Sequence, residues 1–222
     1  MREGRRLALT AWVLGPLGLV LLIGSVLYVR SAYTWVTVAS TSMSPTYTTG
    51  DRLVVELMDG DQVRRGDVVL VDSPLPDLDA PVLKRVVGVG GDRVACCEGS
   101  GTDERVTLNG RPLKESYVRD GVADGIGRPY DLKVPDGQLF LLGDHRGNSI
   151  DSRFYGSGDT AGAVSAGAVR GRVVDGLGGA LFALLGAVLG LVLALVGLGC
   201  GIAARVVRRR SVPPPPPWPV HT

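Results

Sequence analysis

Residues 105–113 read RVTLNGRPL, two short apolar runs that are separated by Asn109-Gly110. An Asn-Gly pair is typical of a two-residue hairpin turn, because both central residues need a positive φ. Outward from this hairpin, residues 33–175 alternate short apolar runs with turn residues and contain no amphipathic helix of ten or more residues. The middle of the chain is therefore predicted to be mainly β.

The apolar runs predict the individual strands. These are Trp35–Ser40, Arg52–Leu57, Asp67–Val71, Val82–Gly88, Arg93–Cys97, Arg105–Leu108, Leu139–Leu142 and Val169–Val174. The stretch Glu115–Tyr130 is rich in Gly and Asp, so we expect a loop or surface flap there.

Two uncharged runs, residues 7–29 and residues 176–204, bracket this middle region. At about 1.5 Å per helical residue, each is long enough to cross a hydrocarbon core of roughly 30 Å. A cleaved signal peptide is the alternative for the first run, but its apolar stretch is long and Arg30 follows it directly. A buried core helix is the alternative for the second. We expect two transmembrane helices.

The charges that flank the runs predict the topology. Residues 1–6 carry three arginines and one glutamate, and residues 205–222 carry four arginines before a tail with five consecutive prolines. Basic flanks stay on the cytoplasmic side, which leaves the acidic residues 30–175 outside. We therefore expect a multi-pass plasma-membrane protein with a cytoplasmic basic N-terminus, an extracytoplasmic β-rich domain and a cytoplasmic Pro-rich tail, which we interpret as solvated rather than as a docking site.

Composition argues against several classes of protein. Disorder over the whole chain is excluded, because 45% of the residues are hydrophobic. Three cysteines are too few for a disulfide framework, and we expect the adjacent Cys96 and Cys97 to be two separate thiols. No zinc-ligand spacing and no phosphate-binding glycine motif is present, so we expect no cofactor, no metal and no nucleic-acid partner.

Nucleophilic catalysis is the chemistry that the residues leave open. A cluster of serines, Ser40, Ser42 and Ser44, follows the first uncharged run, and a serine hydroxyl needs a base. The candidates outside the membrane are His145 and one of only three lysines, of which Lys84 lies in an apolar run. Making a lysine neutral near pH 7 requires a pKa lowered by ~3, or about 4 kcal/mol, which burial can supply. Arg85 also has apolar residues two positions away on either side, so the strand periodicity alone does not distinguish Lys84 from Arg85 as the buried cation.

Five segments then carry a resemblance. They are STSMSPT (40–46), GDRLVV (50–55), RGDVVLV (65–71), KRVVGVGGDRV (84–94) and GDHRGNSIDSRFYG (143–156). In this order and at this spacing, over residues 35–175, the chain resembles the bacterial type I signal peptidases, a family of Ser/Lys-dyad serine proteases. The resemblance implies an antiparallel-sheet, β-barrel-like catalytic domain flanked by two transmembrane helices.

The resemblance also implies an activity and the roles of individual residues. The activity is a membrane-bound endopeptidase that removes signal peptides from exported preproteins after small residues at −1 and −3. The nucleophile is Ser42, the general base is Lys84, and Ser40 joins the Ser42 backbone in the oxyanion hole. The remaining implied roles are support of the lysine by Ser149, Asp151 and Arg153, and substrate pockets lined by Val38, Met43 and Leu83.

The chain departs from the family pattern at a few positions. His145 stands where the last segment has an asparagine, Gly147 where it has an aspartate, and Thr41 where a small residue separates the two serines. A proline that often precedes the first serine is replaced by Ala39. These departures remove none of the implied catalytic groups.

Three alternatives remain at this point. A histidine-dependent triad would pair His145 with Asp144 or Asp151. Self-cleaving repressor-type proteases share the Ser/Lys arrangement, but two membrane runs and no DNA-binding segment argue against them. A non-catalytic exported β-domain would make Ser42 a turn residue only.

Overall fold

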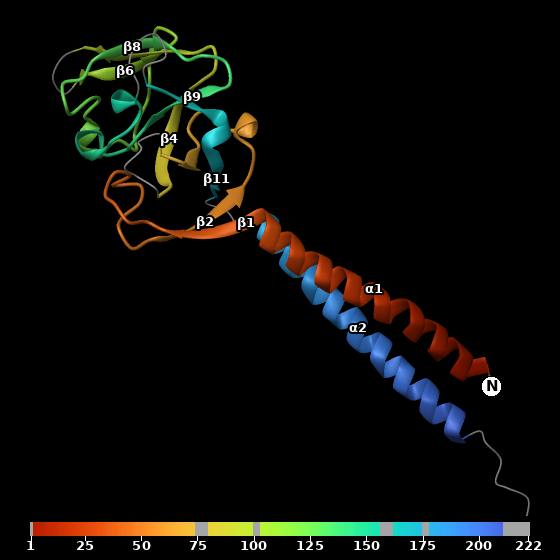
Figure 1. Cartoon of the computed structure of the whole chain (residues 1–222). Coiled ribbons are helices and arrows are strands. Elements are labelled where there is room, and N and C mark those ends of the chain that lie inside the picture. The colour runs from red at the N-terminus through yellow and green to blue at the C-terminus, as the bar shows by residue number, and fades with distance from the viewer. Residues whose placement is uncertain (1, 74–79, 100–102, 156–161, 175–177, 211–222) are drawn as a thin grey trace, which may run out of the picture. The chain divides into compact units, whose positions relative to one another are not determined.

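The computed structural model describes residues 2–73, 80–99, 103–155, 162–174 and 178–210. The chain divides into two compact units, one made of residues 1–31 and 177–222 and the other of residues 32–176 (Figure 1). The predicted tail beyond residue 210 lies outside the described residues.

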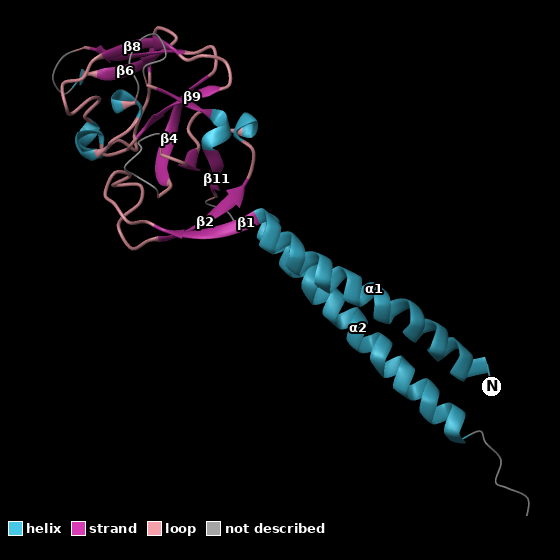
Figure 2. Cartoon of the chain, in the orientation of Figure 1, coloured by secondary structure: helices cyan, strands magenta, loops and turns pink. Residues whose placement is uncertain are grey.

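The first unit consists of two long helices, α1 (Arg2–Ala32) and α2 (Gly178–Arg210) (Figure 2). Both are long enough and apolar enough to cross a membrane. Glycine lets their backbones approach, since a Cβ on Gly190 of α2 would lie 2.6 Å from the backbone nitrogen of Leu22 in α1. Their other apolar side chains are largely exposed.

The second unit contains a seven-stranded sheet in the order β1-β2-β11-β3-β4-β9-β10, with every pairing antiparallel. Its strands are β1 (Tyr33–Thr37), β2 (Arg52–Leu57), β3 (Val68–Val71), β4 (Val82–Val89), β9 (Gln138–Leu142), β10 (Ala163–Ser165) and β11 (Val169–Val173). β3 is buried along its whole length, which explains its unbroken apolar sequence.

A second, four-stranded sheet has the order β7-β6-β5-β8. Its strands are β5 (Arg93–Glu98), β6 (Arg105–Leu108), β7 (Arg111–Pro112) and β8 (Tyr130–Lys133). The predicted hairpin is confirmed, because Leu108 pairs with Arg111 across Asn109 and Gly110, whose φ angles are 52° and 73°. Short 3-10 helices complete the unit: η1 (Gly60–Gln62), η3 (Arg119–Gly121), η4 (Arg146–Asn148), η5 (Ser152–Phe154) and η6 (Ala166–Ala168).

The antiparallel architecture is as expected, but the expected barrel-like closure is wrong. In a barrel every strand is bonded on both sides, whereas here β1 pairs only with β2, and β10 only with β9, among the described residues. The chain leaves the first sheet after β4 through the turn at Gly90 and Gly91 and builds the separate second sheet. The domain is thus two open sheets.

Two local predictions also need correction. The stretch Glu115–Tyr130 is a loop with one 3-10 turn before β8, as expected, but it is not a surface flap, because Val118, Ala123 and Asp124 within it are buried. Cys96 and Cys97 are not separate thiols, because the structure joins them in a disulfide on β5.

One of three apolar core clusters supports the segment that follows β1. It contains Met43, Val55, Val68, Leu70 and Val173, drawn from three strands, β2, β3 and β11, and the loop after β1. Met43 is almost completely buried in it. This cluster fixes the position of the loop that carries the serines.

Candidate active site

Ser42 and Lys84 meet, although 42 positions separate them in the chain. Ser42 lies in the loop after β1, and Lys84 lies on β4. Lys84 Nζ donates to Ser42 Oγ at 3.2 Å and to the Leu83 carbonyl oxygen at 3.1 Å. The hydroxyls of Ser40 and Ser42 are also hydrogen-bonded to each other at 3.1 Å.

Burial makes the Lys84 amine a candidate base. The residue is only 3% exposed. Desolvation lowers its pKa from 10.5 to about 8, the neighbouring Asp151 opposes this change, and the positive charge of Arg153 adds to it. Near neutral pH the neutral amine is therefore far more populated than in a solvated lysine.

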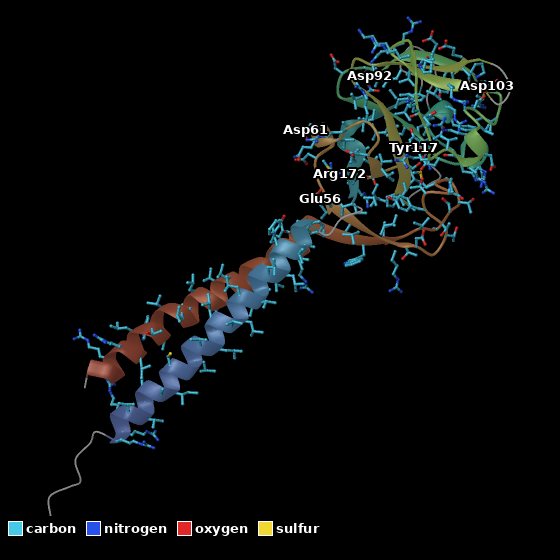
Figure 3. The ribbon with its side chains drawn as sticks, turned by 180° about the vertical axis from the view of Figure 1, so that it is seen from behind. Glu56, Asp61, Asp92, Asp103, Tyr117 and Arg172 are labelled. Carbon is cyan, nitrogen blue, oxygen red and sulfur yellow. A yellow bond between two sulfur atoms is a disulfide. The ribbon has the colours of Figure 1, made fainter. Side chains whose placement is uncertain are left out.

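Arg85, the next residue on β4, has a different environment. Its guanidinium forms a two-pronged ion pair with Asp144, with distances of 2.8 Å and 2.6 Å, and lies 4.0 Å from the centre of the Tyr117 ring. Tyr117 is labelled in Figure 3. Successive residues of a strand point to opposite faces, so only one of the two cations can reach Ser42.

Main-chain contacts hold the serine loop against the segment 143–156. The His145 N–H donates to the Ser42 carbonyl oxygen at 3.0 Å. A Cβ on Gly143 would lie 2.6 Å from that same oxygen, so only glycine fits there. A side-chain contact adds to these, because the Asn148 amide donates to Thr41 Oγ1 at 2.8 Å.

Asp151 and Arg153, both expected to support the lysine, form a buried two-pronged ion pair at 2.8 Å and 2.9 Å. Asp151 also accepts a hydrogen bond from the Gly143 N–H. Neither residue bonds to Lys84 directly, and both act on its pKa through their charge. The Ser149 hydroxyl, expected to support the lysine as well, is buried and has no hydrogen-bond partner among the described residues.

The histidine alternative receives no support from this geometry. His145 Nδ1 is buried without a hydrogen-bond partner among the described residues. The two carboxylates proposed for it, Asp144 and Asp151, are taken by Arg85 and Arg153. The contact of His145 with Ser42 is made by the main chain.

Sequence reasoning missed the residues between 115 and 130 that bind the arginines following Gly143. Arg146 is fully buried and donates to Glu115 at 2.5 Å and to the Ala123 carbonyl oxygen at 2.7 Å. Arg153 reaches Asp124 at 3.0 Å in the same way. The Gly- and Asp-rich composition of residues 115–130 concealed these partners, and only the charges of Glu115 and Asp124 hinted at them.

Ser42 and Lys84 open into a cleft of about 740 Å³. Val38, Met43 and Leu83, expected as pocket residues, all line it. Other lining residues are Val36, Leu70, Val82, Ile126, Ser149, Ile150 and Phe154. The cleft thus combines apolar side chains with several hydroxyls and one amide around the Ser42 hydroxyl and the Lys84 amine.

A serine hydroxyl bonded to a buried amine in a partly apolar cleft can supply the nucleophile and the base of a serine hydrolase. The sequence comparison then identifies the family. Residues 9–175 match the family model described as "Signal peptidase, peptidase S26", and the chain belongs to that family. The resemblance seen in the sequence is therefore confirmed.

Individual curated relatives of this chain are named signal peptidase I. A signal peptidase I of Leptolyngbya laminosa is 35% identical over 132 residues, which cover 54% of this chain and 59% of that protein. A signal peptidase I of Bacillus licheniformis is 33% identical over 125 residues, which cover 52% of this chain and 63% of that protein. The chain thus spans about three fifths of the length of these curated relatives. A solved signal peptidase I of Enterococcus faecalis is 27% identical and covers 51% of this chain and 97% of that one, with a TM-score of 0.39.

Proposed function

We propose that this protein is a membrane-bound serine endopeptidase that removes N-terminal signal peptides from exported precursors. The observation that carries the proposal is the 3.2 Å contact between Ser42 Oγ and the buried Lys84 amine. Membership of the signal peptidase family supports the substrate class. Lysine is the base in this proposal, and no metal or cofactor takes part.

The chemistry follows from the contacts. Neutral Lys84 accepts the Ser42 proton, and Ser42 Oγ attacks the carbonyl carbon of the −1 residue. The Ser42 N–H and the Ser40 hydroxyl stabilise the oxyanion, and losing one such donor typically costs about 10²–10³ in rate. Lys84 then gives its proton to the leaving amine, and it activates a water molecule that hydrolyses the acyl-enzyme.

Among the described residues no strand pairs with the edge of β4 at Leu83, whose carbonyl oxygen accepts only from Lys84 Nζ at 3.1 Å, and an extended substrate can bind there. The Val86 main chain bonds to the β3 side, through Gly66 and Asp67, so by alternation the Leu83 N–H and C=O face the opposite side. There the pairing of β4 with β9 begins only at Arg85. The substrate adds as a strand at this edge and at the segment 38–40. Small −1 and −3 side chains then face Val38, Met43 and Leu83.

The apolar helices suggest where the reaction takes place. Ser42 follows the end of α1, at Ala32, by only ten residues. With α1 in the plasma membrane, this short connection keeps the serine near the bilayer surface at which a membrane-held signal peptide emerges. The lipid bilayer is thus a partner in this proposal, and the catalytic domain is extracytoplasmic.

Precursor cleavage in detergent tests the proposal. We expect Ser42→Ala and Lys84→Ala each to lose about 10³-fold or more in rate. Lys133→Ala is the matched control, because Lys133 is an exposed lysine on β8, and it keeps the wild-type rate. Cleavage by Lys84→Ala together with its loss in His145→Ala would favour the histidine triad, and undiminished cleavage by Ser42→Ala would refute the proposed nucleophile.

A further inference from the structure

We infer that the cleft contains an additional apolar subsite, formed by Ile126, Ile150 and Phe154, that takes an apolar substrate side chain other than those at −1 and −3. The inference rests on the proposed function, since the ligand is the same precursor segment. All three residues line the cleft that contains Ser42 and Lys84.

The exposure of Ile126 and Ile150 sets them apart from the core, whereas Phe154 is half-buried and packs against one core cluster. Ile150 is 56% exposed, and Ile126 is half-buried. Neither residue belongs to any of the three apolar core clusters among the described residues. Apolar surface left open inside a substrate cleft gains free energy when a ligand covers it.

The position of Ile126 is fixed by its neighbours in the chain. Asp124 is buried and accepts from Arg153 at 3.0 Å and from the Arg128 N–H at 2.6 Å. Gly125, with a φ of +75°, packs so closely on Gly147 that a Cβ would lie 2.9 Å from its nitrogen. The segment is therefore tied directly to the segment 143–156, and Ile126 is held at the cleft rather than on a free loop.

Phe154 is fixed as well. The Arg128 guanidinium lies 4.4 Å from the centre of its ring, a cation–π contact. Ile126, Ile150 and Phe154 themselves carry no charge, so the subsite favours an aliphatic or aromatic side chain.

The extended substrate limits which position can reach this subsite. Side chains alternate along a strand, so −1 and −3 lie on one face, and −2 and +1 lie on the other. The −1 and −3 side chains face Val38, Met43 and Leu83. The apolar side chain that meets Ile126 and Ile150 is therefore the one at −2 or at +1.

Cleavage of matched peptides by the full-length protein tests the subsite. Each peptide has alanine at −1 and −3, and leucine or alanine at −2, or at +1. For the wild type we expect the kcat/KM for leucine to exceed that for alanine by about tenfold at one of these two positions, as one well-placed aliphatic contact provides. Ile126→Ser lowers this ratio toward one. Val122→Ser, which changes a 42% exposed valine of the same segment that does not line the cleft, keeps the ratio.

Two results would overturn the subsite while leaving the proposed function intact. In one, the wild type cleaves the alanine peptide but shows no preference at −2 or +1. In the other, Ile126→Ser keeps the wild-type preference. If the wild type cleaves none of the peptides, the proposed function itself is refuted, and the subsite with it.

Discussion

At the scale of single residues, the role proposed for Lys84 predicts that the rate of cleavage depends on pH. Since its pKa is about 8, and since only the neutral amine can accept the Ser42 proton, kcat/KM should rise about tenfold per pH unit below pH 8 and level off above it. Arg153 lowers this pKa through its positive charge. Arg153→Met removes that charge and leaves Asp151 unpaired, and both changes raise the Lys84 pKa.

The pH–rate profile of Arg153→Met should therefore move to higher pH than that of the wild type. Arg93→Met is the control, because Arg93 forms an exposed ion pair with Asp131 on the second sheet, and its profile should match the wild type. A profile of Arg153→Met that falls in height without moving along the pH axis would show that Arg153 only stabilises the fold.

Lys84 should also lower stability in a pH-dependent way. Its pKa falls from 10.5 to about 8 on folding, so the unfolded chain binds the proton more tightly, and folding is penalised by about 3 kcal/mol below pH 8. The penalty shrinks as the pH rises from 8 to 10.5. We expect Lys84→Met to be inactive yet more stable than the wild type at pH 7, with a smaller difference at pH 10.

Urea unfolding in detergent at the two pH values measures this difference. Lys133→Met, at an exposed position, should change the stability little at either pH. A stability gain in Lys84→Met that is the same at pH 7 and pH 10 would contradict the titration of Lys84 and point to packing alone.

The sequence could place Lys84 in an apolar strand but could not choose it over Arg85, because both have apolar neighbours two positions away. The choice depends on partners distant in the chain. Arg85 forms an ion pair with Asp144, and Lys84 forms a hydrogen bond with Ser42. Within the sequence, only the resemblance to signal peptidases favours Lys84 over Arg85 as the base. The structure supplies the physical reason for it.

At the scale of elements, the segment 115–130 supports the segment 143–156 through buried charges. Glu115 and Arg146 are both almost completely buried and pair at 2.5 Å. Removing one partner of such a pair leaves the other charge unpaired in the interior, at a cost of about 3 kcal/mol or more. Glu115→Gln should therefore lower the free energy of unfolding by about that amount.

Asp131→Asn provides the comparison, because its pair with Arg93 is exposed on both sides and should contribute much less to stability than the buried pair. Both variants are measured by the same urea titration in detergent. Equal, small effects of the two substitutions would mean that the Glu115–Arg146 pair contributes little to holding the segment 115–130.

Strand prediction succeeded where the local signals were strong. β2 and β6 have the predicted bounds, and the Asn109-Gly110 turn carries its own backbone requirement. β8 lies at the end of a stretch rich in Gly and Asp, and β10 is only three residues long. Pairing with β5 and with β9 makes these two segments strands, and such partners are not visible in a local pattern.

At the scale of the whole molecule, the charges predict one orientation in the membrane. Four arginines follow the apolar part of α2, and arginines that flank a span stay in the cytoplasm. The residues between the helices then lie outside, where exported precursors arrive. The disulfide between Cys96 and Cys97 agrees with an oxidising compartment.

Labelling with a membrane-impermeant maleimide tests this orientation in a Cys200→Ala background. We expect Asp136→Cys, at an exposed turn of the second unit, to react in intact cells, and Ser211→Cys, just after α2, to react only after lysis. The background without either new cysteine controls for labelling of residues 96 and 97. The reverse pattern would place the Ser42–Lys84 pair in the cytoplasm, where a peptidase of exported precursors could not meet a translocated cleavage site, so the proposed function would lose its physical basis.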